Sequence, residues 1–171
     1  MEKIIIFDMD GVIVDSEYTF LGTKTDMLRD EGFETDISYQ YQFMGTTFDF
    51  MWQKMKDELD LPREVSDYIE EMDRRRELLI ERDGVRSIKV AQKLIHWLAD
   101  HGYRLAVASS SPMRDIMRAL TELAIVDCFE VKVTGDDVAH SKPAPDVFLR
   151  AAELLGVDPS ICTVIEDTKN G

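Results

Sequence analysis

Two carboxylates stand two positions apart near the start of the chain. Asp8 and Asp10 directly follow an apolar run, Ile4–Phe7, and Gly11 comes next. Acids this close repel each other and lose solvation, so they need a cation, a shared proton or ample water. The alternative for so short a pattern is an acidic turn, because Asp and Gly are ordinary turn residues.

Polar residues suited to phosphate chemistry follow three further apolar runs. The candidates are Ser109 and Ser110 after 104–108, Lys142 in the loop beyond 129–133, and Glu166 and Asp167 after 162–165. Carboxylates from two such places can hold Mg²⁺, which prefers oxygen ligands. Serine hydroxyls and the backbone N–H groups that start a helix bind phosphate oxygens, and a lysine supplies a compact positive charge. Each candidate alone has an ordinary explanation as a turn, cap or surface residue.

The elements that carry these residues alternate between strand and helix. The four apolar runs predict strands at 4–7, 104–108, 129–133 and 162–165, the first two of them buried. Helical spacing predicts helices at 17–31, at 47–59, from Pro62 to 79, at 90–98, from Pro112 with Ser111 as its N-cap, and from Pro145 to 155. This alternation indicates an α/β fold, a doubly wound (Rossmann-like) parallel sheet. Parallel strands bring their carboxyl ends, and all the candidates, to one edge.

Between the first strand and Asp83 the sequence predicts only helices, so the alternation of strands and helices is interrupted there. We therefore expect a catalytic α/β core at 1–15 and 83–171 and an inserted α-helical cap domain at 16–82. The Met and aromatic residues spaced helically along 48–59 are predicted to pack between helices. The sequence stops just beyond a strand, so we expect the core to be C-terminally incomplete.

Charge and composition limit the class of partner. The formal net charge is −14 and the pI about 4.5, which argues against binding nucleic acid or anionic membranes. A small phosphorylated metabolite remains as a partner if local cations surround its phosphate. The chain has no apolar run of about 20 residues, no room for a signal peptide before the first strand, and two distant cysteines, Cys128 and Cys162, that are expected to be buried and unpaired. These features predict a cytoplasmic location.

The whole set closely resembles the haloacid dehalogenase superfamily, over the full length of the chain. The family's four motifs match Asp8-Met9-Asp10-Gly11, Ser109, Lys142 within Ser-Lys-Pro-Ala-Pro-Asp, and Glu166-Asp167. The resemblance implies that Asp8 is the nucleophile and Asp10 the general acid and base. It also implies that Asp8, Asp167 and the Asp10 carbonyl hold Mg²⁺, with Glu166 assisting, while Ser109, Ser110 and Lys142 bind phosphate. The helical insertion is similar to the cap of the branch containing β-phosphoglucomutase and small-molecule phosphatases.

Two departures favour a phosphatase over a mutase. The mutases carry a histidine where this chain has Thr19, and a cap arginine where it has Phe48. We therefore expect a Mg²⁺-dependent phosphohydrolase that acts on a small phosphate monoester through an aspartyl-phosphate. A β-phosphoglucomutase-type phosphotransferase is the alternative within the family. A receiver-like or catalytically silent phosphate-binding regulatory protein is the alternative from another class.

Overall fold

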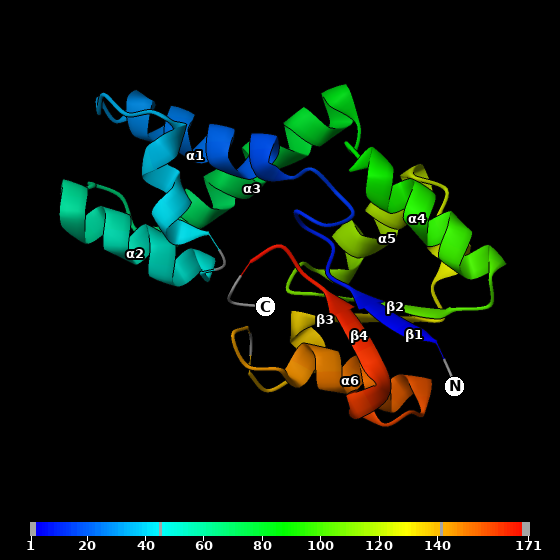
Figure 1. Ribbon diagram of the computed structural model, residues 1–171. Helices are drawn as coiled ribbons and strands as arrows, with labels where there is room; N and C mark the ends of the chain where they lie inside the picture. Colours follow the sequence, from blue (N-terminus) through cyan, green and yellow to red (C-terminus); the bar gives the residue numbers. More distant parts are fainter. Residues whose placement is uncertain (1–2, 45, 141, 169–171) are drawn as a thin grey trace. The chain divides into compact units, whose positions relative to one another are not determined.

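The computed structural model describes residues 3–44, 46–140 and 142–168. The chain divides into two compact units, Met1–Asp15 with Val85–Gly171, and Ser16–Gly84. The first is built from strands and helices, and we call it the α/β unit. The second contains only helices among its described elements, and we call it the helical unit (Figure 1).

A four-stranded parallel sheet forms the centre of the α/β unit. Its strands are β1 (Ile4–Phe7), β2 (Arg104–Ser109), β3 (Val131–Thr134) and β4 (Cys162–Ile165), in the order β3-β2-β1-β4. Ile4 pairs with both Arg104 and Cys162, and Phe7 pairs with both Val107 and Ile165. The carboxyl ends of β1 and β4 are therefore level, which places the residues after them side by side.

Helices cover both faces of the sheet, as a doubly wound fold requires. The helices α4 (Lys89–Asp100) and α5 (Met113–Glu122) lie on one face, and α6 (Asp146–Leu155) lies on the other (Figure 1). Successive side chains of β1 point to opposite faces of the sheet, so the strand contributes to both cores. Phe7 belongs to the apolar core with Ile95 and Ile116, whereas Ile4 and Ile6 belong to the core beneath α6.

Three prolines precede their helices instead of forming the first helical residue. Pro112 and Pro145 are the N-cap residues of α5 and α6. Helix α3 begins at Val65, three residues after Pro62, because Glu64 still has an extended backbone. The predicted third strand is also shifted. Phe129 is buried in the core, but pairing with β2 begins only at Val131.

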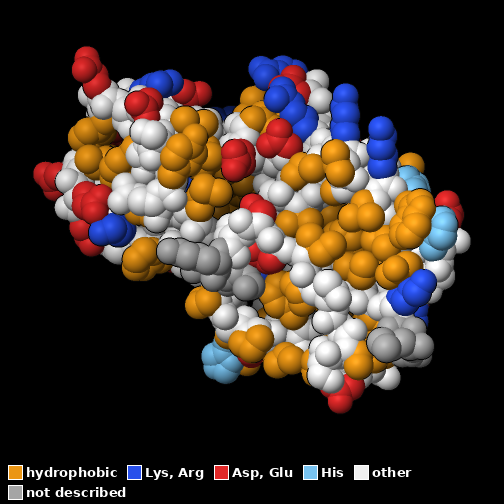
Figure 2. Space-filling model, viewed as in Figure 1, with side chains coloured by type: hydrophobic (Ala, Val, Ile, Leu, Met, Phe, Trp, Pro, Cys, Tyr) orange, Lys and Arg blue, Asp and Glu red, His pale blue; other side chains and the backbone are white. Residues whose placement is uncertain are grey.

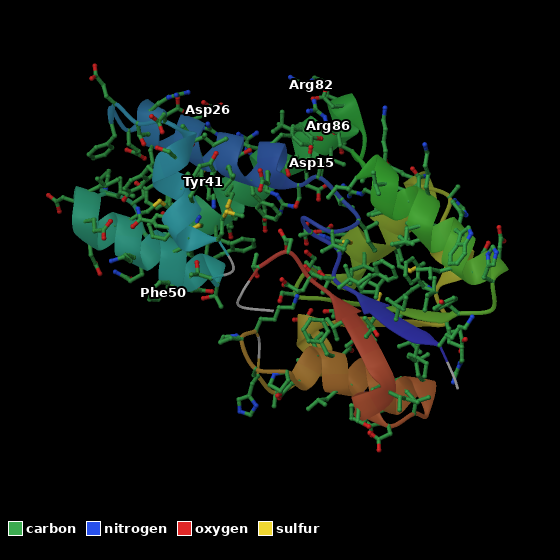
Figure 3. The ribbon with its side chains drawn as sticks, in the orientation of Figure 1. Asp15, Asp26, Tyr41, Phe50, Arg82 and Arg86 are labelled. Carbon is green, nitrogen blue, oxygen red and sulfur yellow. The ribbon has the colours of Figure 1, made fainter. Side chains whose placement is uncertain are left out.

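The helical unit contains α1 (Glu17–Asp30), a 3₁₀ segment (Ile37–Phe43), α2 (Phe48–Leu59) and α3 (Val65–Asp83). The 3₁₀ segment was not predicted from the sequence. Met51, Trp52 and Met55 are fully buried, and the Trp52 ring stacks on Tyr68. The predicted packing role of the Met and aromatic residues is thus confirmed. Two aromatic residues outside this core, Tyr41 and Phe50, are exposed (Figure 3).

The chain passes between the units at two points, and within each unit one hydrogen bond joins the two segments that lead to these points. Within the α/β unit, the N–H of Asp15 donates to the carbonyl oxygen of Arg86 at 2.8 Å (Figure 3). Within the helical unit, the Tyr18 hydroxyl donates to the carbonyl oxygen of Gly84 at 3.1 Å.

The surface of the described residues has two further features. None of their helices has both the length and the apolar character needed to span a bilayer. Apolar side chains gather on the α/β unit around α4 (Figure 2), where Val90, Leu94 and Trp97 are exposed. Cys128 and Cys162 are free thiols but only half-buried, because each lies at the margin of a core; the prediction that both are buried was wrong.

Candidate active site

The residue after β1 is anchored to the neighbouring strand. The N–H of Asp8 donates to the carbonyl oxygen of Ile165, the last residue of β4, at 3.0 Å. Asp8 is only 6% exposed, so its carboxylate has little access to water. It therefore depends on nearby groups for charge compensation.

Lys142 supplies part of that compensation. Its ammonium nitrogen lies 3.0 Å from Oδ1 of Asp8 and 3.1 Å from Oε1 of Glu166, and all three side chains are largely buried. Glu166 also accepts hydrogen bonds from the backbone N–H and the hydroxyl of Thr168. These bonds fix the Glu166 carboxylate, which in turn holds Lys142 beside Asp8.

Three carboxylates converge at this point. Oxygen atoms of Asp8, Glu166 and Asp167 lie within 4.8 Å of one another. One lysine cannot balance three negative charges, and hard divalent cations such as Mg²⁺ select carboxylate oxygens as ligands. The donor set thus fits a bound Mg²⁺.

The environment of the cluster changes its acidities. Burial raises the pKa of Asp8 from 3.8 to about 6, Lys142 opposes this rise, and Asp10 adds to it. Burial and the charge of Glu166 raise the pKa of Asp167. Both shifts arise because desolvation and neighbouring negative charge disfavour the ionised carboxylate, and a bound cation would offset that effect.

The carboxylate of Asp10 is not part of the trio. Its Oδ2 accepts a hydrogen bond from the Ser111 hydroxyl at 2.6 Å. Ser111 was expected to cap α5, but Pro112 occupies the N-cap position, and the Ser111 N–H donates to Oγ of Ser109 at 3.1 Å. The loop after β2 is therefore connected to the turn after β1.

The two serines proposed for phosphate binding differ in exposure. Ser109 is 1% exposed at the end of β2, whereas Ser110 is exposed in the loop. The backbone of Ser110 packs against Gly135, where an added Cβ would lie 3.4 Å from the Ser110 carbonyl oxygen. The loops after β2 and β3 therefore lie close together.

The structure brings most of the predicted candidates together and adds one group. Asp8, Lys142, Glu166 and Asp167 form one cluster, and Ser111 connects Asp10 to Ser109. Ser141, part of the third motif, lies outside the described residues. The contact of Ser111 with Asp10 joins residues 101 positions apart, so no local sequence signal could have indicated it.

Comparisons with known proteins point to one family. The family model described as haloacid dehalogenase-like hydrolase matches residues 5–171. Fructose-1-phosphate phosphatase YqaB of Escherichia coli is 31% identical, the match covering 98% of this chain and 87% of that protein. Hexitol phosphatase B of Escherichia coli is 29% identical, with 97% of this chain and 75% of that protein covered.

A solved structure shares both the fold and part of the sequence. The crystal structure of a HAD family hydrolase from Deinococcus radiodurans R1, with bound phosphate and sodium, superposes with a TM-score of 0.79. It is 26% identical, and the match covers 99% of this chain and 74% of that one. The similarity therefore extends over both units of the chain.

Proposed function

The chain belongs to the haloacid dehalogenase-like hydrolase family, and we propose that it is a Mg²⁺-dependent phosphatase that hydrolyses a small phosphate monoester through an aspartyl-phosphate. One observation carries the proposal, the convergence of Asp8, Glu166, Asp167 and Lys142 at the carboxyl end of a parallel sheet. Relatives that are phosphatases by name support the same reaction class.

Phosphoryl transfer is proposed to proceed in two steps, and the two aspartates have different roles in each. In the first, a carboxylate oxygen of Asp8 bonds to phosphorus, the bond to the leaving oxygen breaks, and Asp10 gives that oxygen its proton. In the second, a water oxygen bonds to phosphorus, its proton passes to Asp10, and the bond to Asp8 breaks. Inorganic phosphate leaves, and both aspartates return to their starting states.

The surrounding residues bind and orient the phosphoryl group. Ser109, at the buried end of β2, and the Ser110 backbone are proposed to donate to phosphate oxygens, and Lys142 places positive charge beside the attacking carboxylate. Asp8, Asp167 and the Asp10 carbonyl would hold Mg²⁺, with Glu166 assisting. When bound, the ion neutralises charge on the phosphoryl group and on the carboxylates.

Two residues of the helical unit favour hydrolysis over a mutase reaction. Thr19 stands where the mutases have a histidine, and its hydroxyl donates to the Ser16 carbonyl oxygen at 2.9 Å inside α1. Phe48 stands where they have an arginine, and its ring lies 5.5 Å from the Phe20 ring. Neither residue offers the imidazole or guanidinium of the mutases.

We also propose that the helical unit acts as a cap and selects the substrate. Its sequence spans the insertion that follows the first motif in the family branch described above. A chimera that carries the equivalent insertion of hexitol phosphatase B in place of 16–84 is expected to acquire that enzyme's substrate preference. An unchanged preference would contradict this role.

The decisive test is a phosphatase assay over sugar phosphates, hexitol phosphates, nucleotides and pyrophosphate, with Mg²⁺ and with chelator. We expect Mg²⁺-dependent release of phosphate from a small phosphate monoester and none from Asp8→Asn. Undiminished turnover by Asp8→Asn would disprove the nucleophile assignment. A phosphoryl label that stays on the protein without turnover would favour a receiver-like protein.

A further inference from the structure

Ser111 lies between two groups that the proposed function uses. Its hydroxyl donates to Oδ2 of Asp10 at 2.6 Å, and its backbone N–H donates to Oγ of Ser109 at 3.1 Å. Asp10 follows β1, and Ser109 ends β2. A single residue of the loop after β2 therefore connects the proposed acid and base to a proposed phosphate-binding hydroxyl.

The conformation of this loop prevents Ser111 from capping α5. A residue before proline is restricted to extended backbone conformations, and Pro112 itself is extended, with φ −59° and ψ 149°. The helix starts from the Pro112 carbonyl oxygen, which accepts from the N–H of Asp115 at 3.0 Å and of Ile116 at 3.2 Å. The Ser111 side chain is consequently left to interact with the neighbouring turn.

The contact restricts the Asp10 side chain. Asp10 and Ser111 are both half-buried, and a 2.6 Å distance is typical of a strong hydrogen bond from a hydroxyl to a carboxylate. A carboxylate two residues beyond the nucleophile reaches the leaving oxygen only in part of its conformational range. Restricting that range in advance removes an entropic cost from the reaction.

We propose that Ser111 is a positioning residue for Asp10, an inference that rests on the proposed phosphatase function. Its hydroxyl occupies Oδ2 and directs Oδ1 to the leaving oxygen in the first step and to water in the second. Ser111 keeps its own proton throughout. It contributes to the rate through the orientation of Asp10, and its effect therefore depends on how much protonation the leaving group needs.

The test compares two substrates by kcat/KM, which reports the steps up to the first irreversible one. An alkyl phosphate such as glycerol phosphate needs its leaving oxygen protonated, whereas the p-nitrophenolate of p-nitrophenyl phosphate leaves without protonation. Since general acid catalysis contributes about 10²–10⁴-fold, we expect Ser111→Ala to lower kcat/KM by about 10-fold or more for the alkyl ester. The value for the aryl ester should change by less than about 3-fold.

Further variants separate positioning from folding. Ser111→Thr keeps the hydroxyl and should restore the alkyl ester reaction, whereas Ser111→Cys keeps the shape with a weak donor and should not. Ser87→Ala, a matched control, removes another half-buried hydroxyl that bonds a side chain of the α/β unit and should affect neither substrate. In an Asp10→Ala background, Ser111→Ala should have no further effect on the alkyl ester.

Several outcomes would overturn the inference. Equal losses for both esters would make Ser111 a structural residue only, and unchanged values for both would show that Asp10 needs no such partner. If Ser111→Ala does not fold, the Ser111→Cys and Ser111→Thr pair decides between the same outcomes. Failure of the proposed function is distinguishable, because it would appear as activity that survives Asp8→Asn.

Discussion

Gly11 and Asp167 approach each other so closely that no side chain fits between them. A Cβ on Gly11 would lie 2.0 Å from Oδ2 and 2.5 Å from Cγ of Asp167. Gly11 also has φ +79°, a conformation that other residues adopt only with strain. Glycine is therefore favoured at this position of the first motif for two reasons. One is the positive φ, and the other is the space needed by Asp167, a proposed metal ligand that follows another strand.

Gly11→Ala should displace Asp167 and weaken Mg²⁺ binding. Since misplacement by about 1 Å can cost about 10²-fold in rate, we expect kcat to fall by that order and the Mg²⁺ concentration for half-maximal activity to rise. Steady-state kinetics over a Mg²⁺ titration measures both. Gly102→Ala is the matched control, because Gly102 has φ +76° and a Cβ added there would meet no atom within 4 Å. Equal losses in the two variants would refute the explanation through Asp167.

Lys142→Met should damage both activity and stability. The variant leaves Asp8 and Glu166 buried without the ammonium that now lies about 3 Å from each, and breaking a buried pair costs about 3–5 kcal/mol. Without metal, the free energy of unfolding should therefore fall by about that amount near neutral pH, less at acidic pH. Turnover should fall by about 10²–10³-fold. Lys142→Arg should not restore turnover, because the planar guanidinium cannot replace a compact ammonium.

The control for that variant is Lys93→Met, which removes an exposed lysine from α4. Denaturant titration and kinetics should show little change for it. Turnover of Lys142→Met within about threefold of wild type would contradict the contribution expected of Lys142.

Much of the α/β unit could be predicted from the sequence, because its strands coincide with runs of mostly apolar residues, although β4 is partly exposed. The strands at Ile4–Phe7 and Cys162–Ile165 have the predicted bounds. Strand order then brings Asp8 and Asp167 together at one edge, so their proximity follows from topology. The first residues of the helices were less predictable. A proline at the N-cap position and a proline at the first helical position give the same sequence pattern.

The contacts within the site could not be predicted in the same way. Ser111 precedes a proline and has the sequence signature of an N-cap, yet its hydroxyl bonds Asp10, which is remote in sequence. Gly11 has the signature of an ordinary turn, yet it also provides space for Asp167. Such contacts depend on how loops from different strands pack, and local sequence patterns carry no information about that packing.

The stabilisation that Mg²⁺ gives should depend on pH. Burial raises the pKa of Asp8 from 3.8 to about 6, so the folded, metal-free protein binds more protons than the unfolded chain between these values. Its stability therefore falls as pH rises through this window, by about 3 kcal/mol, and stays low above it. Mg²⁺ binds the ionised carboxylates, so the rise in Tm on adding it should be larger at about pH 8 than at about pH 5.

Thermal unfolding with Mg²⁺ and with chelator, at both pH values, measures this dependence. Asp167→Asn removes a proposed ligand and should reduce the rise in Tm at the higher pH. A rise in Tm that is equal at both pH values would show that the ion binds elsewhere.

A buried lysine should limit the stability of the helical unit. Lys24 is 4% exposed, and its ammonium nitrogen lies 3.2 Å from Sδ of Met51. Burial lowers its pKa from 10.5 to about 8, and the charge of Arg76 adds to the effect. The guanidinium of Arg76 lies over the Phe20 ring, 3.4 Å from the ring centroid. Phe20 is one helical turn before Lys24 on α1. Two cations thus lie close together, and Arg76 also pairs with Asp73 at 3.4 Å.

Lys24→Met should therefore stabilise the protein near neutral pH. A lysine whose pKa is lowered on folding destabilises the folded state fully below the folded pKa, and stability recovers as pH rises from about 8 to about 10.5. The variant should gain about 3 kcal/mol at about pH 7, and the gain should shrink as pH approaches 10. Lys54→Met, which removes an exposed lysine paired with Glu58, should change stability by less than about 1 kcal/mol. Denaturant titrations at several pH values distinguish the two, and a loss of stability in Lys24→Met at neutral pH would mean that the contact with Met51 outweighs the cost of burying the charge.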